Sequence, residues 1–422
     1  MAKFGQELPM PTFWWEGRVD RENKLYNIAD PNNTLGLNYG SMTLPEKWVT
    51  NKNGILQKTR LGVPSSEFNP DGSYKGFLAE SQAITIVANS AFAGTIGVGN
   101  TPTSWAYSNV GGDGTRETKR SIKIDGSNAV KLSAGTGDRR SYLQQQITTT
   151  EGANTIQVVV ESYSGSGNSR FLTLIPGLGS VMLNEMDGFN PSGSFPQSIS
   201  HTFTISSASA GSTALRIGFG TNANDVLATD NDEMTISGID IKTGSVASSP
   251  IIHSGSGIST RSPDNLVITN AQNAIGQSEG VVLVEVDVRD QTFINFVGVL
   301  SLSSTNENNF VEIGRASSGA LYSRVFSNGQ IVGSTSLLLG EPSGINKFLI
   351  KYKSGDIKIY ANGSLGQTIT ATFSFDSILS LIQIGLRLQQ TVRATNDHIR
   401  SVKIWNTADW LTDEIAQNLT SL

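Results

Sequence analysis

The chain of 422 residues is long enough for roughly two to three domains, each with its own core. It contains no cysteine, which excludes disulfide bonds, thiol catalysis, cysteine-ligated zinc and iron–sulfur clusters. Its net charge of −5 is mildly acidic and only 16% of its residues are charged, so we expect no nucleic-acid partner, because phosphate binding needs clustered cations.

The polar character comes instead from the 44 glycines and from serine and threonine, a composition typical of turn-rich all-β proteins. No window approaches about 18 consecutive apolar residues, so we expect no insertion into a membrane. The opening residues MAKFGQELPMPTFWWEGR contain no apolar run of the length found in a signal peptide. Composition alone leaves both a cytosolic protein and a component of a virus particle open.

Residues 1–83 form the first predicted segment and show little periodicity. They contain Trp14, Trp15 and Trp48, half of the six tryptophans. A large aromatic surface on a segment of weak intrinsic structure indicates docking, either on a partner or on the chain's own next domain. A small core formed within the segment is the alternative.

Residues 84–248 form the second predicted segment, in which short runs alternate apolar and polar residues. Examples are residues 155–161, 201–205 and 234–241. β-Branched residues within the runs, and Gly, Asn and Ser between them, are typical of half-buried strands. The pattern predicts an antiparallel β-sandwich or jelly roll.

Residues 249–422 form the third predicted segment. A polar connector, residues 249–274, precedes further alternating runs such as 280–288, 346–352 and 398–405. These runs predict a second antiparallel β-sandwich, so the expected fold class is all-β, with an irregular N-terminal arm followed by two tandem sandwiches.

Two local signals within the third segment are specific. The dipeptides Asn328-Gly329 and Asn362-Gly363 predict tight hairpins, because both central positions of a type I′ turn need a positive φ. Residues 412–422 predict a short C-terminal helix with Thr412 as its N-cap, since acidic residues follow at once and apolar residues recur one turn apart.

Several stretches resemble known proteins. Residues 61–82, LGVPSSEFNPDGSYKGFLAESQ, resemble the opening segment of bacteriophage tail and virion appendage proteins, where a GVPR-D run leads to a glycine and an LLxEPQ strand. Residues 84–92, ITIVANSAF, with Trp105 after them, are similar to the start of jelly-roll carbohydrate-binding modules. Residues 231–250 resemble the phage pattern YIDGVQLEEGSxATSYI. The resemblance implies a jelly-roll, carbohydrate-binding-like domain over residues 84–248.

The last segment resembles a laminin-G/concanavalin A-like lectin sandwich. The resemblance rests on residues 346–363, on HIRSVKIWN at 398–406 and on LTDEIA at 411–416, which follow one another in the order found in phage versions of that sandwich. It implies a lectin-like domain over residues 249–422, the connector included.

Together the resemblances imply a non-enzymatic phage virion protein, a tail fibre or appendage. Its N-terminal segment would dock on other virion proteins through Trp14, Trp15 and Trp48, and its outer domains would adhere to host-surface polysaccharide or lipopolysaccharide. Such a protein would be made in the host cytoplasm, lie on the surface of the phage particle and form a homotrimer. A capsid-decorating head fibre or a tail subunit that binds no glycan is the alternative, since sandwich folds serve both roles.

A metal site is considered at one acidic loop. Carbohydrate-binding modules of this type hold a structural calcium ion, but the matching positions here are Ser237 and Ala91, which argues against an inherited site. The loop at residues 225–233 offers oxygen ligands that a hard cation such as calcium accepts. These are Asp225, Asp230, Asp232 and Glu233. A solvated acidic loop is the other interpretation, and we expect no other cofactor.

The sequence gives little support to catalysis. His201, His253 and His398 lie far apart and in no metal-binding or nucleophile motif. Glu285 and Asp287 would share one side of a strand, as a glycoside hydrolase's carboxylate pair could, and Asp230 with Asp232 is the other candidate pair. An exposed polar strand face is the favoured interpretation of Glu285 and Asp287. A polysaccharide depolymerase is therefore the least favoured function, and we predict no enzyme.

Glycan binding needs exposed aromatic rings together with side chains that form hydrogen bonds to sugar hydroxyls. The predicted glycan-binding residues are Trp105, Tyr107, Arg139, Arg140, Tyr142, Tyr322 and Arg387. Arg324 and Arg393 are further candidates in the third segment. Core packing is the alternative for Trp105, and a solvated surface is the alternative for Arg139 and Arg140.

Overall fold

The structure is a computed structural model. The described residues are 8–19, 25–27, 38–39, 45–53, 56–59, 65–69, 71–80, 82–110, 114–122, 124, 127–135, 140–165, 170–175, 181–193, 195–220, 232–244, 247–289, 297–306, 308–316, 320–336, 343–385 and 395–422.

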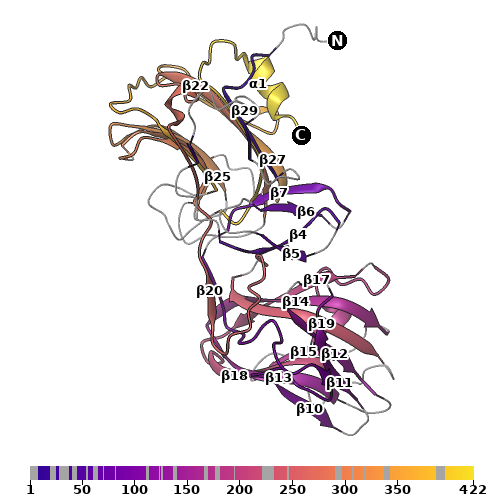
Figure 1. Ribbon diagram of the computed structural model, residues 1–422. Coiled ribbons are helices and arrows are strands. Elements are labelled where there is room, and N and C mark those ends of the chain that lie inside the picture. The colour runs from indigo at the N-terminus through magenta and orange to yellow at the C-terminus, as the bar shows by residue number, and fades with distance from the viewer. Residues whose placement is uncertain are drawn as a thin grey trace. The chain divides into compact units, whose positions relative to one another are not determined.

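The chain folds into two compact units, each built from several separate stretches of sequence (Figure 1). Unit 1 comprises Met1–Glu46, Thr59–Gln82 and Ser262–Leu422, and unit 2 comprises Lys47–Lys58 and Ala83–Arg261. The predicted segment 1–83 is therefore divided between the two units, and the boundary expected at residue 248 lies between Arg261 and Ser262.

Unit 1 is a sandwich of two antiparallel sheets. The first sheet has the order β2 (Leu25–Asn27), β1 (Phe13–Val19), β31 (His398–Trp405), β22 (Glu279–Val288), β27 (Gly344–Lys353), β28 (Ile357–Ala361) and β29 (Ser364–Ile369), with β7 (Tyr74–Leu78) on β31 and β6 (Ser66–Phe68) on β7. The second has the order β26 (Gln330–Ser336), β25 (Leu321–Ser327), β24 (Phe310–Arg315), β23 (Val297–Ser303), β30 (Leu381–Ile384), β21 (Leu266–Thr269) and β3 (Asn38–Tyr39).

Strand β22 carries apolar side chains that pack on both faces of the first sheet. Val282, Val284 and Val286 point into the core between the two sheets, while Val281 and Leu283 point to the opposite face. That opposite face is covered by α1 (Asp413–Thr420), the single α-helix among the described residues. Because both sides of the strand are buried, most of its residues are apolar.

Unit 2 is a second antiparallel sandwich. One sheet has the order β10 (Ala106–Val110), β13 (Arg140–Thr149), β18 (Gly211–Phe219), β15 (Arg170–Ile175) and β16 (Val181–Met182). The other has the order β17 (Gln197–Ile205), β14 (Gly152–Ser164), β19 (Glu233–Thr243), β12 (Asn128–Ser133), β11 (Arg116–Arg120) and β9 (Gly97–Val98). Two short pairs complete the unit: β4 (Trp48–Thr50) with β5 (Leu56–Lys58), and β8 (Ala83–Thr85) with β20 (Ser259–Arg261).

The structure confirms the all-β fold with two tandem sandwiches and a short C-terminal helix. Asn328 and Asn362 have φ of 53° and 47°, and the glycine after each also has a positive φ, as predicted for tight hairpins. The hydroxyl of Thr412 accepts a hydrogen bond from the amide of Ile415 at 3.2 Å, so the predicted N-cap is present. No helix among the described residues is long and apolar enough to cross a membrane.

Two of the three N-terminal tryptophans are buried in the cores of the two units. Strand β1 pairs with β31, which places Phe13 and Trp15 in the core of unit 1, where both are almost completely buried. Trp48 is buried in unit 2 against Leu56 and Val159. Trp15 and Trp48 are thus enclosed by the chain itself, which corrects their assignment to a surface that docks on a particle.

Trp14 lies on the other face of β1. Its side chain is half-buried, and the amine of Lys403 lies 4.6 Å from the centroid of its ring. Of the three predicted docking residues, Trp15 and Trp48 are buried, and Trp14 is the most exposed.

Candidate functional site

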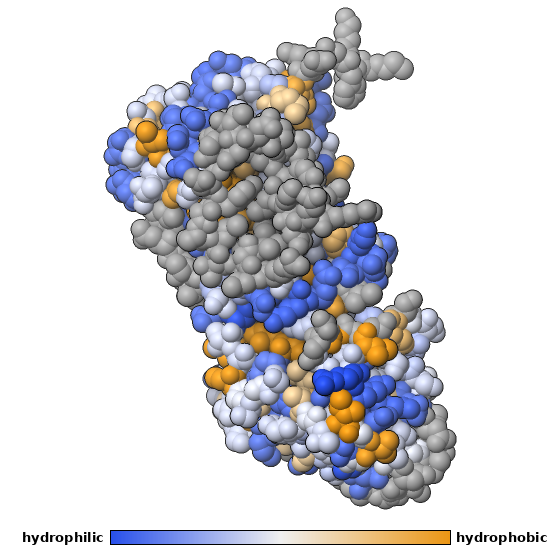
Figure 2. Space-filling model, viewed as in Figure 1, coloured by the Kyte–Doolittle hydropathy of each residue, from blue (hydrophilic) through white to orange (hydrophobic). Residues whose placement is uncertain are grey.

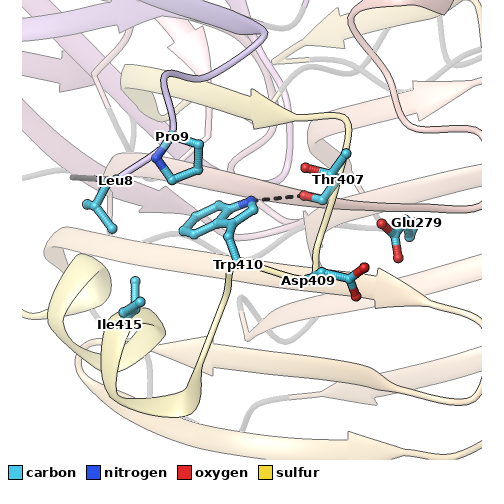
Figure 3. A pocket seen from close by; sticks show the side chains of 7 residues that line it. All are labelled: Leu8, Pro9, Glu279, Thr407, Asp409, Trp410 and Ile415. Atoms are coloured by element: carbon cyan, nitrogen blue, oxygen red, sulfur yellow. Dashed lines mark hydrogen bonds between the residues drawn. The ribbon is translucent and has the colours of Figure 1, made fainter. Parts of the chain in front are cut away.

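A groove on unit 1 combines an aromatic ring with carboxylates. It has a volume of about 460 Å³ and opens to solvent. Its lining consists of Leu8, Pro9, Glu279, Thr407, Asp409, Trp410 and Ile415 (Figure 3). We call it the Trp410 groove.

Trp410 is fixed in the loop between β31 and α1 by two contacts. Its ring packs on the buried ring of Trp405, with centroids 5.1 Å apart and an interplanar angle of 51°. Its indole Nε1 donates to the carbonyl oxygen of Thr407 at 3.0 Å, as the dashed line in Figure 3 shows. Because the indole nitrogen is satisfied within its own loop, the half-buried ring offers the groove its carbon atoms.

The acidic side of the groove is organised by Lys353 on β27. The Lys353 ammonium lies 2.8 Å from the Glu279 carboxylate and also donates to the Asp409 carboxylate. The hydrogen bonds to Asp409 and Glu279 raise the pKa of Lys353, and the hydrogen bond from Lys353 lowers the pKa of Asp409. Lys353 and Asp409 therefore both remain charged at neutral pH.

The helical wall of the groove is anchored to the sheet. Asp413, at the start of α1, accepts hydrogen bonds from the Lys358 ammonium at 2.6 Å and from the Tyr360 hydroxyl at 2.7 Å. The hydrogen bonds from Lys358 and Tyr360 lower the pKa of Asp413, so this link is ionised at neutral pH. Ile415, in the first turn of the helix, is thereby held at the edge of the groove (Figure 3).

The opposite wall comes from the N-terminal end of the described chain. The indole Nε1 of Trp405 donates to the carbonyl oxygen of Pro9 at 2.8 Å, and this hydrogen bond ties the segment of Leu8 and Pro9 to β31 in the first sheet. Leu8 is 44% exposed. The groove thus has apolar walls of Leu8, Pro9 and Ile415 around the indole, and acidic oxygens at its other end. This combination suits a ligand that has both an apolar face and hydroxyl groups.

The residues predicted for glycan binding in unit 2 do not form one surface. Trp105 is only 7% exposed, and its Nε1 donates to the carbonyl oxygen of Asn89 at 3.2 Å. This agrees with the alternative interpretation of Trp105 as a core residue. Tyr107 is half-buried beneath Arg116, and its hydroxyl lies 2.9 Å from that of Ser141. Tyr107 pairs with the core residue Leu143, so its ring lies on the inner face of the sheet.

Tyr142 lies on the outer face of the same sheet, since it precedes Leu143 on β13. It is 5% exposed, with the guanidinium of Arg216 5.2 Å from its ring centroid. Arg140 is the first residue of β13. Arg139 lies outside the described residues. The predicted cluster is therefore split between the two faces of one sheet.

In unit 1, Tyr322 is 5% exposed, and the guanidinium of Arg324 lies 5.1 Å from its ring centroid. Arg324 also forms an ion pair with the buried Glu312 at 2.6 Å. Tyr322 is therefore a packed residue rather than an open platform. Arg387 and Arg393 lie outside the described residues.

The acidic loop proposed for calcium is only partly described, because Asp225 and Asp230 lie outside the described residues. Asp232 is buried and accepts a hydrogen bond from the Tyr163 hydroxyl at 3.1 Å. Glu233 forms an ion pair with Lys131 at 2.8 Å. Within the described part of the chain, no three His, Asp or Glu side chains gather as a metal site would require.

Glu285, which was considered for catalysis, and two of the histidines form contacts within the fold. Glu285 accepts a hydrogen bond from the Arg400 guanidinium at 2.7 Å. His398 lies 2.6 Å from Glu67, and His253 contacts the carbonyl oxygen of Val87. These contacts give Glu285 and the two histidines structural roles.

Trp410 was not among the residues predicted for binding. Its sequence signal is a tryptophan beside an aspartate in a polar loop, two residues before a helix N-cap. A tryptophan in such a loop has no buried strand face on which to pack. This feature could have indicated that its ring lies at the surface. The groove is lined by residues near positions 8, 279 and 410. These positions are far apart in the sequence, and only the order of the strands in the sheet brings them together.

No protein-family model matches the chain, and no curated protein matches it. Among solved structures, the chain is similar to the CBM40 of Ruminococcus gnavus IT-sialidase bound to α2,3-sialyllactose, at 15% identity and a TM-score of 0.30, over 36% of this chain and 88% of that one. Domain 4 of a GH43 extracellular arabinanase from Geobacillus stearothermophilus, in complex with arabinotriose, aligns at 14% identity and a TM-score of 0.31, over 39% and 77%. A heptameric SAP-like pentraxin from Limulus polyphemus aligns at 16% identity and a TM-score of 0.27, over 34% and 70%. At these values no functional residue is transferred to this chain.

Proposed function

We propose that the protein binds carbohydrate through the Trp410 groove and does so without catalysing a reaction. The observation that carries the proposal is the half-buried indole of Trp410, which lies beside the carboxylates of Glu279 and Asp409 (Figure 3). A pyranose ring has an apolar C–H face that packs on an indole, and hydroxyl groups at its rim that donate to carboxylates. The groove supplies both kinds of partner.

The charges in the groove argue against hydrolysis. A glycoside hydrolase needs one carboxylic acid that keeps its proton near neutral pH. The hydrogen bond from Lys353 instead lowers the pKa of Asp409, and the same ammonium lies 2.8 Å from Glu279. Asp409 therefore does not have the environment of a general acid, and binding is the function that we propose for this groove.

The affinity of one groove is expected to be low. A monosaccharide has about 12 non-hydrogen atoms, and at about 0.3 kcal/mol per atom its binding reaches about 4 kcal/mol, which corresponds to a dissociation constant near 1 mM. Several copies on one particle would raise the avidity by orders of magnitude. A homotrimer, the assembly implied by the resemblance to tail fibres, would supply three grooves.

The biological setting that we propose is the surface of a bacteriophage particle, as a tail fibre or appendage made in the host cytoplasm. The support is the similarity of residues 61–82 and 231–250 to phage appendage sequences. Other virion proteins would hold the chain, and the groove would contact polysaccharide or lipopolysaccharide of the host envelope.

The test is binding of the full chain to host cells or their isolated polysaccharide. Trp410→Ala should abolish saturable binding. The matched control is Phe68→Ala on β6, which removes another half-buried ring from unit 1 outside the groove and should leave binding unchanged. Absence of saturable binding by the unmodified protein would contradict the proposal and favour a purely structural subunit, and release of reducing ends from the polysaccharide would show an enzyme.

A further inference from the structure

We propose that the Trp410 groove selects neutral, hydroxyl-rich sugars and rejects sugars that carry a carboxylate. This inference rests on the proposed function and names the class of ligand. It follows from the charges in the groove and from the hydrogen-bonding atoms that remain available there.

The charge balance at the polar end is negative. Two carboxylates, Glu279 and Asp409, are met by one ammonium, that of Lys353. The next acidic residue along the chain, Asp413, is already neutralised by Lys358 at 2.6 Å. A ligand carboxylate placed at this end would therefore meet one uncompensated negative charge.

The acidic end of the groove offers an exposed hydrogen-bond acceptor. The indole Nε1 of Trp410 is occupied by the carbonyl oxygen of Thr407, and the Lys353 ammonium is held by the two carboxylates. The second oxygen of Asp409, Oδ2, has no hydrogen-bond partner within the described structure, and this side chain is 78% exposed. A sugar hydroxyl group can donate a hydrogen bond to this oxygen, whereas a ligand carboxylate can only accept hydrogen bonds.

A cationic ligand is disfavoured for a different reason. Aromatic rings beside carboxylates can attract ammonium groups. Here the ammonium of Lys353 already occupies the position between the two carboxylates. A second cation would have to displace Lys353, while a neutral hydroxyl group can use the oxygen that remains.

The experiment uses two pairs of free sugars that differ only at C6, glucose with glucuronic acid and galactose with galacturonic acid. Each is titrated into the full-length protein, and binding is followed by the NMR shift of the Trp410 indole N–H, assigned through Trp410→Phe. We expect at least one neutral sugar to bind about fivefold or more tightly than its acidic partner.

A charge-reversal variant tests the cause of the preference. Asp409→Lys changes the balance to one carboxylate against two ammonium groups, so the acidic member of the pair should now bind at least as tightly as the neutral one. Asp71→Lys makes the same change in an exposed turn of unit 1 outside the groove and should keep the original preference.

The outcomes separate the two proposals. If both members of a pair bind at Trp410 but the acidic sugar binds equally or more tightly in the unmodified protein, the inference is overturned and carbohydrate binding stands. If neither the sugars nor host polysaccharide shift the Trp410 signal, the proposed function is overturned as well.

Discussion

The rings of Trp405 and Trp410 pack on each other with centroids 5.1 Å apart, yet their environments differ. Trp405 is 4% exposed and its Nε1 donates to the carbonyl oxygen of Pro9. Trp410 is half-buried and lines the groove (Figure 3). Trp405 therefore supports the Trp410 groove from within the fold, whereas Trp410 lines it.

Substitution of the two tryptophans should separate stability from binding. Trp405→Ala should lower the free energy of unfolding of unit 1 by about 3–5 kcal/mol, because a buried ring leaves a cavity. Trp410→Ala should cost less than about 1.5 kcal/mol and remove carbohydrate binding. Urea unfolding monitored by circular dichroism, together with a sugar titration, measures both quantities. Equal losses of stability would contradict this division of roles.

Deletion of residues 1–48 should unfold unit 1. The deletion removes β1, whose residues Phe13 and Trp15 are at most 1% exposed in the core. It also removes Trp48 from unit 2. Limited proteolysis should degrade unit 1 of the deletion variant rapidly, whereas an intact protease-resistant fragment of residues 262–422 would contradict the prediction.

A point variant gives the same test without truncation. Trp15→Ala should lower the free energy of unfolding by about 3–5 kcal/mol. Trp14→Ala, on the opposite and half-buried face of β1, should cost clearly less. Similar losses for the two variants would show that the alternation of β1 is not as described.

Trp105→Ala should destabilise unit 2 by about 3–5 kcal/mol, since the indole is in the core and its Nε1 is bonded to Asn89. Tyr107→Phe is a milder comparison, because it removes only the hydroxyl contacts with Ser141 and with the carbonyl oxygen of Gly114, at a cost of about 1 kcal/mol. Thermal unfolding measures both. A Trp105→Ala protein of unchanged stability would restore the interpretation of Trp105 as an exposed binding platform.

Local signals in the sequence predicted much of the fold. Period-two alternation located strands such as β14 and β22, and Asn362-Gly363 predicted the hairpin between β28 and β29, because these features depend on neighbouring residues. The pairing of β1 with β31 brings together residues nearly 400 positions apart, for which no local rule exists. The division of residues 1–83 between the two units could therefore not be predicted.

The candidate site was harder to predict than the fold for the same reason. Tyr107 and Tyr142 looked like one aromatic cluster, but the strand register places them on opposite faces of the sheet. On the face shown in Figure 2, areas of hydrophobic residues alternate with areas of hydrophilic residues. The Trp410 groove is recognisable only when the walls from Leu8, Glu279 and Ile415 are assembled.

Acidification should weaken unit 1 through the contact between His398 and Glu67. His398 is 1% exposed, and its Nδ1 has no hydrogen-bond partner in the described structure. Burial lowers the pKa of His398 below its usual 6.5, although the nearby Glu67 partly offsets this effect. The imidazole is therefore neutral at pH 7, and its Nε2–H donates to Glu67 at 2.6 Å.

Because the unfolded chain binds the His398 proton more readily than the folded chain, the free energy of unfolding should fall as the pH drops below 6.5, by up to about 1.4 kcal/mol per pH unit. Burial raises the pKa of Glu67, but the charge and hydrogen bond of His398, with Lys75 and Arg289, outweigh it and lower the pKa to about 2. Protonation of Glu67 therefore adds a further loss of stability between pH 4.5 and 2.

Urea unfolding at pH 7.5, 6.5, 5.5 and 4.5 measures the slope. His398→Gln should be less stable at pH 7.5 but should lose less on acidification, while His201→Gln in unit 2 should retain the slope of the unmodified protein. If unit 1 became more stable on acidification, or if His398→Gln kept the full slope, His398 would not be the titrating group.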